Sequence, residues 1–143
     1  MTDTTRAAPP KSFWIVSAVS LLWNAFGGYL YLAAKLDPQT ALASAPAAMQ
    51  DYIAQMPLWA HVGWSLGIWG SLLGSVLLLL RSRHAVAAFL VSLLGAIASY
   101  AAQAQAGVLT PAEPIMILAV IALLLWFSRR SRDRGLLNYS GMR

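Results

Sequence analysis

Six side chains in this sequence could do chemistry within a largely apolar chain. They are Asn24, Tyr31, His61, Ser99, Gln103 and Glu113. Polar groups of these kinds are costly to bury in an apolar environment without a partner, so they mark either contacts between helices or the path of a ligand. We predict that the six line a polar path or contact a small ligand, with His61 or Glu113 at its outer mouth.

Asn24 lies near the middle of an apolar run, on a stripe of small and polar residues. At about 100° per residue, six side chains of this run share one helix face. They are Ser17, Ser20, Asn24, Gly28, Tyr31 and Lys35. This face should contact protein rather than lipid, and the Asn24 amide should bond either another helix or a ligand.

His61 and Glu113 each allow two interpretations. His61 is either structural and interfacial or a pH-sensing or substrate-binding group at the outer mouth. Since His61 and His84 are predicted at opposite membrane faces, we expect no haem held by both, whereas ligation by one histidine and a methionine stays open. Glu113, between Pro111 and Pro114, either begins a helix, where a carboxylate complements the dipole, or couples the protein to protons or cations.

The sequence lacks the motifs of common enzymes. It has no cysteine, which excludes disulfides and thiol chemistry. No two carboxylates share a helix face within the membrane, no glycine-rich loop joins a strand to a helix, and no histidine pair has the spacing of metal ligands. We therefore predict a protein that is not an enzyme, with no catalytic residues, no metal and no cofactor.

The composition indicates a membrane protein. Hydrophobic residues make up 59% of the 143 residues and charged residues only 10%, against about 25% charged in ordinary soluble domains. The net charge of +5 comes from residues beside apolar runs rather than along a soluble face, so we expect no nucleic-acid partner. The fold class predicted is all-α, an integral membrane antiparallel four-helix transmembrane bundle with a short extracytoplasmic helical loop.

Apolar runs of about 20 residues, enough to cross a bilayer, set the predicted domain boundaries. Residues 1–12 are predicted to be a disordered cytoplasmic leader and 128–143 a basic cytoplasmic tail. Between them, 13–127 form the transmembrane domain, with a fourth helix whose start is the least certain boundary. The predicted spans are 13–34, 57–80, 85–106 and 111–127. The first span is interpreted as an uncleaved signal anchor, with a cleaved signal peptide as the alternative.

The second span carries a stripe of glycines that predicts close helix packing. Gly63, Gly67, Gly70 and Gly74 fall on one face, and we expect this face to meet the small-residue faces of the first and third spans. The loop before it, residues 35–56, contains a short apolar-faced segment. That segment is either a fixed cap over the helix ends or a moving lid.

The basic residues predict the orientation. If four helices span, Lys35 is the only one of the ten Lys and Arg on its side of the membrane. Because cytoplasmic loops are enriched in Lys and Arg, both termini are predicted to be cytoplasmic.

Several short motifs carry a resemblance to a known group. These are Trp23-Asn24 with Gly27-Gly28, then Pro57-Leu58-Trp59, Ala85 through Phe89 leading to Ser92-Leu93, and Trp126-Phe127-Ser128-Arg129-Arg130. With them the chain resembles small four-helix bacterial inner-membrane proteins of unknown function, some of which carry the automatic label "sugar transporter". The resemblance implies a multi-pass protein of a bacterial inner (cytoplasmic) membrane.

Two functions remain open from the sequence. The first is a small membrane protein that binds or transports a small molecule, as a homo-oligomer because four helices seldom enclose a polar path. The second is an accessory or scaffold subunit that packs against a larger membrane complex. In both cases the lipid bilayer is a partner.

Overall fold

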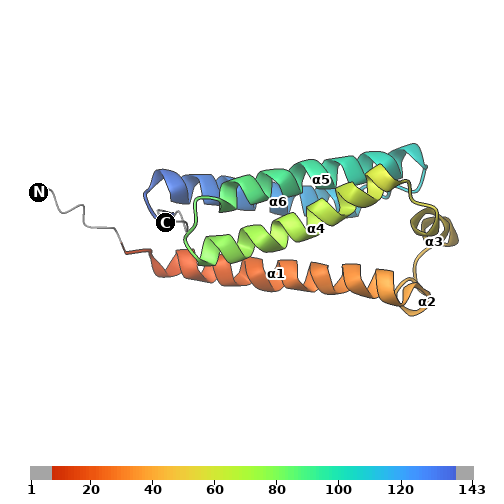
Figure 1. Ribbon diagram of the computed structural model, residues 1–143, viewed down its shortest axis with the longest axis horizontal. Coiled ribbons are helices and arrows are strands. Elements are labelled where there is room, and N and C mark those ends of the chain that lie inside the picture. Colours follow the sequence, from red (N-terminus) through yellow and green to blue (C-terminus); the bar gives the residue numbers. More distant parts are fainter. Residues whose placement is uncertain (1–7, 138–143) are drawn as a thin grey trace, which may run out of the picture.

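The computed structural model describes residues 8–137, and these form six helices and no strand (Figure 1). The helices are α1 Lys11–Leu36, α2 Pro38–Ala41, α3 Ala47–Ala54, α4 Leu58–Leu79, α5 Ala85–Gln105 and α6 Ala112–Asp133. By length and composition, α1, α4, α5 and α6 can each cross a membrane. The predicted all-α antiparallel four-helix bundle is therefore confirmed, and the chain is a multi-pass membrane protein.

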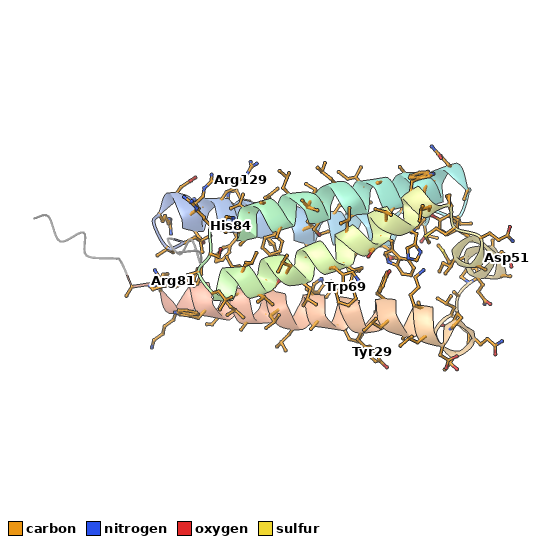
Figure 2. The ribbon with its side chains drawn as sticks, viewed as in Figure 1. Tyr29, Asp51, Trp69, Arg81, His84 and Arg129 are labelled. Atoms are coloured by element: carbon orange, nitrogen blue, oxygen red, sulfur yellow. The ribbon has the colours of Figure 1, made fainter. Side chains whose placement is uncertain are left out.

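The two ends of the bundle differ in charge (Figure 2). Arg81, His84 and Arg129 lie at one end, which we call the basic end and which holds the start of α1, the α4–α5 turn and the end of α6. Asp51 lies at the other end, which we call the capped end because α2 and α3 cover it. The basic residues gather at one end because the antiparallel order of the helices brings the start of α1, the α4–α5 turn and the end of α6 together there.

Helix α1 begins earlier than the sequence predicts. Lys11 and Ser12 are helical, so the leader predicted over 1–12 is too long at its end, while 1–7 lie outside the described residues. The helix starts directly after Pro10, whose φ of −64° and ψ of 158° are extended. Proline lacks an N–H group and is tolerated there because that group would have no helical partner.

Helix α6 ends later than the sequence predicts. It continues past 127 to Asp133, so the first part of the basic tail is helical. Hydropathy marks where a chain leaves apolar surroundings, whereas arginine is itself a good helix former, so the helix outlasts the apolar run. It stops before Gly135, whose φ of 74° is typical of the residue after a helix. Residues 138–143 of the predicted tail lie outside the described part.

Helices α4 and α5 form the most extensive contact in the bundle. A Cβ added at Gly95 of α5 would lie 2.7 Å from the Gly63 carbonyl oxygen and 2.8 Å from the Gly67 nitrogen. The Ser92 hydroxyl donates a 2.6 Å hydrogen bond to the Gly67 carbonyl. The glycine stripe of α4 therefore meets α5 alone along its length, and Gly74 of the same stripe packs on a phenylalanine of α5. The prediction that the glycine stripe also meets α1 is therefore wrong.

Helix α1 packs on α4 through buried hydroxyl groups. Ser20 and Ser75 share a 2.6 Å hydrogen bond, and the Ser75 hydroxyl also donates to the backbone of its own helix at 3.0 Å. Both serines are buried. Since lipid offers no hydrogen-bond partners, pairing polar groups between helices keeps these residues inside the bundle.

An apolar cluster closes the basic end. Phe13 of α1 and Phe127 of α6 are stacked with ring centroids 6.0 Å apart. Leu136 and Leu137, which follow α6, fold back into the same cluster. The Arg81 guanidinium donates a 2.9 Å hydrogen bond from Nε to the carbonyl oxygen of Leu136.

At the capped end, two short helices bridge α1 and α4. Asp37 caps α2 by accepting a 3.3 Å hydrogen bond from the Thr40 N–H, and Pro38 occupies the first turn of this helix. Pro46 precedes α3. Within residues 8–137, α1 and α6 are not among the closely packed helix pairs. These two helices therefore pack less closely on each other than α1 packs on α4 and α6 packs on α5.

Candidate functional site

A cavity of about 540 Å³ lies in the half of the bundle nearest the capped end. Residues of all six helices line it, together with the segments that join α2 to α3 and α3 to α4. Its lining is mostly aliphatic and aromatic, with a few polar groups. The polar lining residues besides the tyrosines are Asn24, Ser71, Ser99, Gln103 and Glu113.

Five of the six predicted site residues meet at this cavity. They are Asn24, Tyr31, Ser99, Gln103 and Glu113. Three helices contribute them, so the bundle brings together groups that are up to 89 positions apart in the chain. The sixth, His61, is not among the lining residues, but it contacts one of them directly.

Asn24 is held by α4 at the deep side of the cavity. Its amide nitrogen donates to the Ser75 hydroxyl at 2.7 Å and more weakly to Ser20 at 3.4 Å. Its amide oxygen accepts a 2.7 Å hydrogen bond from Ser71. The amide thus joins α1 to α4, and its oxygen keeps capacity for one more donor.

Tyr31, Lys35 and His61 form a polar chain at the rim. The Lys35 ammonium donates to His61 Nδ1 at 2.9 Å. Nδ1 can accept this bond only through its lone pair, so the ring hydrogen lies on Nε2. Nε2 is 3.4 Å from the Tyr31 hydroxyl. Because Tyr31 and Lys35 are one turn apart on α1, both reach the same histidine of α4.

Aromatic rings surround the Lys35 ammonium. Its nitrogen lies 4.8 Å from the centroid of the Trp64 ring and 5.8 Å from that of Tyr31. The two rings meet edge to face at 4.7 Å, and Trp69 packs on Tyr31 from the other side at 5.7 Å. A cation placed over the face of tryptophan or tyrosine is attracted by the electron-rich ring. In the part of the chain that the structure describes, Lys35 has no carboxylate partner.

Glu113 and Tyr100 stand on the opposite wall. Glu113 lies in the first turn of α6, where the helix dipole favours an anionic group. Its carboxylate interacts with the hydroxyl of Tyr100 on α5. Ser99 and Gln103 of α5 flank this pair along the cavity.

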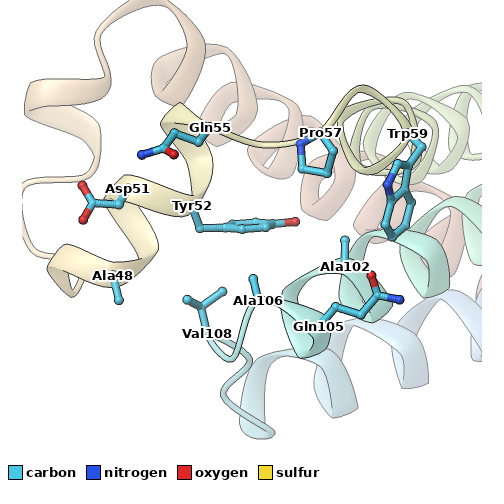
Figure 3. A pocket seen from close by; sticks show the side chains of 10 residues that line it. All are labelled: Ala48, Asp51, Tyr52, Gln55, Pro57, Trp59, Ala102, Gln105, Ala106 and Val108. Carbon is cyan, nitrogen blue, oxygen red and sulfur yellow. The ribbon is translucent and has the colours of Figure 1, made fainter.

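Helix α3 covers the cavity with the apolar face that the sequence predicts. Met49, Tyr52, Ile53 and Met56 all line the cavity from this side. Tyr52 also borders a second hollow of about 570 Å³, and its ring extends from α3 toward the gap between Pro57 and Ala102 (Figure 3).

The hydroxyl of Tyr52 is buried and has no hydrogen-bond partner among residues 8–137. Burial raises the pKa of Tyr52 above its ordinary value of 10.0, because an anion would lose its hydration there.

The side chains around the cavity can hold and orient a small molecule. Among residues 8–137 no three His, Cys, Asp or Glu side chains gather as they would around a metal ion. The lining instead combines aromatic walls, one carboxylate and several hydrogen-bonding groups, which is the usual make-up of a small-molecule site.

Sequence reasoning missed several residues of the site. Trp64 and Tyr100 were not selected, although Tyr100 lies one turn before Gln103 on α5 and could have been found from that spacing. The Lys35–His61 contact had no such signal, because it depends on how deep α4 sits beside α1.

Comparison with known proteins adds no relative: no family model, curated protein or solved structure matches the chain.

Proposed function

We propose that this protein binds an amphipathic small molecule in the cavity beneath α3. The observation that supports this proposal most directly is that five polar residues from three helices converge on one cavity whose remaining lining is mostly apolar. Its volume of about 540 Å³ falls within the roughly 300–1,000 Å³ typical of sites for small ligands. Polar groups in such a site orient a ligand while the apolar walls supply most of the affinity.

Entry from the capped end fits the packing. The Phe13–Phe127 stack and the hydrogen-bonded serines lie between the cavity and the basic end. In this conformation these contacts separate the cavity from that end. Transport would require a second conformation in which α1 and α6 part at the basic end.

We further propose that both termini lie in the cytoplasm, which the charge distribution supports; the bacterial inner membrane is what the resemblance implies. Arg81, Arg83 and the arginines at the end of α6 lie at the basic end, and cytoplasmic segments are enriched in such residues. Reporter fusions after residue 143 and within 42–46 test this topology. A C-terminal reporter active outside the cytoplasm would contradict it.

A cavity-filling variant tests binding. Gly27 lines the cavity, and a Cβ there would have its nearest neighbour, Ile68, at 3.9 Å, so Gly27→Leu enters open space. Ala25→Leu adds the same side chain on an exposed face of the same helix and serves as the control. Native mass spectrometry of protein purified in mild detergent should detect a bound small molecule in the wild type and in Ala25→Leu, and lose it in Gly27→Leu.

The same measurement separates the accessory alternative. If neither variant changes the bound small molecules but one loses a co-purified protein, the chain is a subunit of a larger complex and the binding proposal fails. The mass of the intact assembly also tests the predicted homo-oligomer.

A further inference from the structure

We infer that the ligand of this cavity is a hydrophobic organic cation, an amine or quaternary ammonium compound with apolar substituents. This inference rests on the proposed binding function and names its ligand class. It follows from the position of the charged groups around the cavity and from the nature of its walls.

The charge inside the cavity is negative. Of the described residues that line it, Glu113 is the only one with a charged side chain, and its carboxylate interacts with Tyr100 in the cavity wall. Glu113 is itself exposed, so its carboxylate lies at the edge of the cavity. A ligand that binds beside this carboxylate is favoured if it carries the opposite charge.

The cavity walls already hold a cation. The Lys35 ammonium lies over the ring of Trp64 at 4.8 Å and near that of Tyr31 at 5.8 Å, and both rings line the cavity. These rings are therefore presented with faces accessible to a positive group. An anion would meet the electron-rich faces and the Glu113 carboxylate together, which disfavours it.

The Lys35 ammonium competes with a cationic ligand for the face of the Trp64 ring. This ammonium is anchored by a neutral histidine nitrogen, His61 Nδ1, rather than by a carboxylate. An organic cation on the Trp64 face would displace or repel it. Removing the Lys35 charge should therefore strengthen cation binding, whereas removing the Glu113 charge should weaken it.

Two probe ions of the same shape and opposite charge test the ligand class. Tetraphenylphosphonium and tetraphenylborate are measured by equilibrium dialysis against the full chain in non-ionic detergent, with Gly27→Leu as the blank for uptake by micelles. We expect saturable binding of the phosphonium ion to the wild type and weaker binding of the borate ion.

The variants should shift phosphonium affinity in opposite directions. Glu113→Gln should lower it by roughly two- to fivefold, as loss of an exposed charged partner does. Lys35→Gln should raise it by roughly threefold, because a like charge at the aromatic face is removed. Glu113→Asp and Lys35→Arg keep the charges and should stay close to the wild type, which separates a charge effect from a folding defect.

The outcomes are distinct. Tighter binding of the borate ion, loss of binding in Lys35→Gln, no effect of Glu113→Gln on phosphonium affinity, or no binding of either ion would overturn the cationic class. The binding function itself would still stand if the co-purified small molecule is displaced by Gly27→Leu and retained by Ala25→Leu. It fails only if that molecule is absent or insensitive to both substitutions.

Discussion

Replacing Gly95 by alanine should separate the two most closely packed helices of the bundle. The added Cβ would lie 2.7 Å from the carbonyl oxygen of Gly63 and 2.8 Å from both Gly67 N and Leu66 Cβ. Ordinary van der Waals contact begins at 3.4 Å, and backbone atoms cannot rotate away as side chains do. Helix α5 must therefore move, which also lengthens the 2.6 Å hydrogen bond from Ser92 to the Gly67 carbonyl.

The expected loss follows from two opposing terms. Overpacking a well-packed interface costs about 1–3 kcal/mol, and weakening a hydrogen bond between membrane helices adds about 0.6 kcal/mol. Alanine has a higher helix propensity than glycine by about 1 kcal/mol. Gly95→Ala should thus lower the free energy of unfolding by about 0.6–2.6 kcal/mol.

The matched control is Gly27→Ala, where the nearest atom to the new Cβ is Ile68 Cδ1 at 3.9 Å. This variant gains the propensity without the clash and should be as stable as the wild type or up to about 1 kcal/mol more stable. Unfolding by SDS in mixed micelles, followed by the fluorescence of the six tryptophans, measures both. If Gly95→Ala and Gly27→Ala unfold at the same SDS fraction, backbone contact does not determine how α4 and α5 pack.

Two further substitutions test groups near the cavity in the same assay. Asn24→Leu loses two 2.7 Å side-chain bonds to α4 and should cost about 1–2 kcal/mol; an unchanged stability would refute the bridging role. Tyr52→Phe removes a buried hydroxyl without a partner in residues 8–137 and should be neutral or stabilising by about 1 kcal/mol. Because burial raises the pKa of Tyr52, the wild type should lose stability as pH rises above 10.0, and the variant less.

The membrane-spanning helices were predictable because the hydropathy of consecutive residues alone indicates whether a segment can cross a bilayer. An apolar run long enough for a bilayer has one structural solution, a helix, and each predicted span overlaps its helix with ends that differ by a few positions. The exception is α6, which continues to Asp133. There the apolar run ends, but arginine still favours a helix. The end of the apolar run therefore does not mark the end of the helix.

The site was predictable only in part, for a related reason. Asn24 and Tyr31 share a face of α1, and Ser99 and Gln103 share a face of α5, so spacing alone selects them. Contacts between helices depend on relative depth and rotation, which no single helix encodes. The Lys35–His61 hydrogen bond and the choice of α5 over α1 by the glycine stripe are both of this kind.

The position of the cavity follows from where small and large residues lie. Glycine, alanine and serine bring α4 and α5 together, which leaves α1 on the flank of α4 and α6 on the flank of α5. Near the capped end, Trp64, Tyr31 and Tyr100 occupy the space between these flanks, and their rings cannot pack it fully. At the basic end, Phe13 and Phe127 meet and close it.

This arrangement also determines which helices are able to move. Helices α4 and α5 are tied by close backbone contact, whereas α1 packs closely only on α4 among the long helices and α6 only on α5. A passage to the basic end would open if the Phe13–Phe127 stack separated, and that requires no change in the α4–α5 pair. The hydrogen bonds of Ser20 and Asn24 to α4 restrict α1, whereas the polar contact that the structure shows between α6 and α5 is that of Glu113 with Tyr100. Helix α6, which carries Glu113, is therefore the element that a ligand can shift most easily.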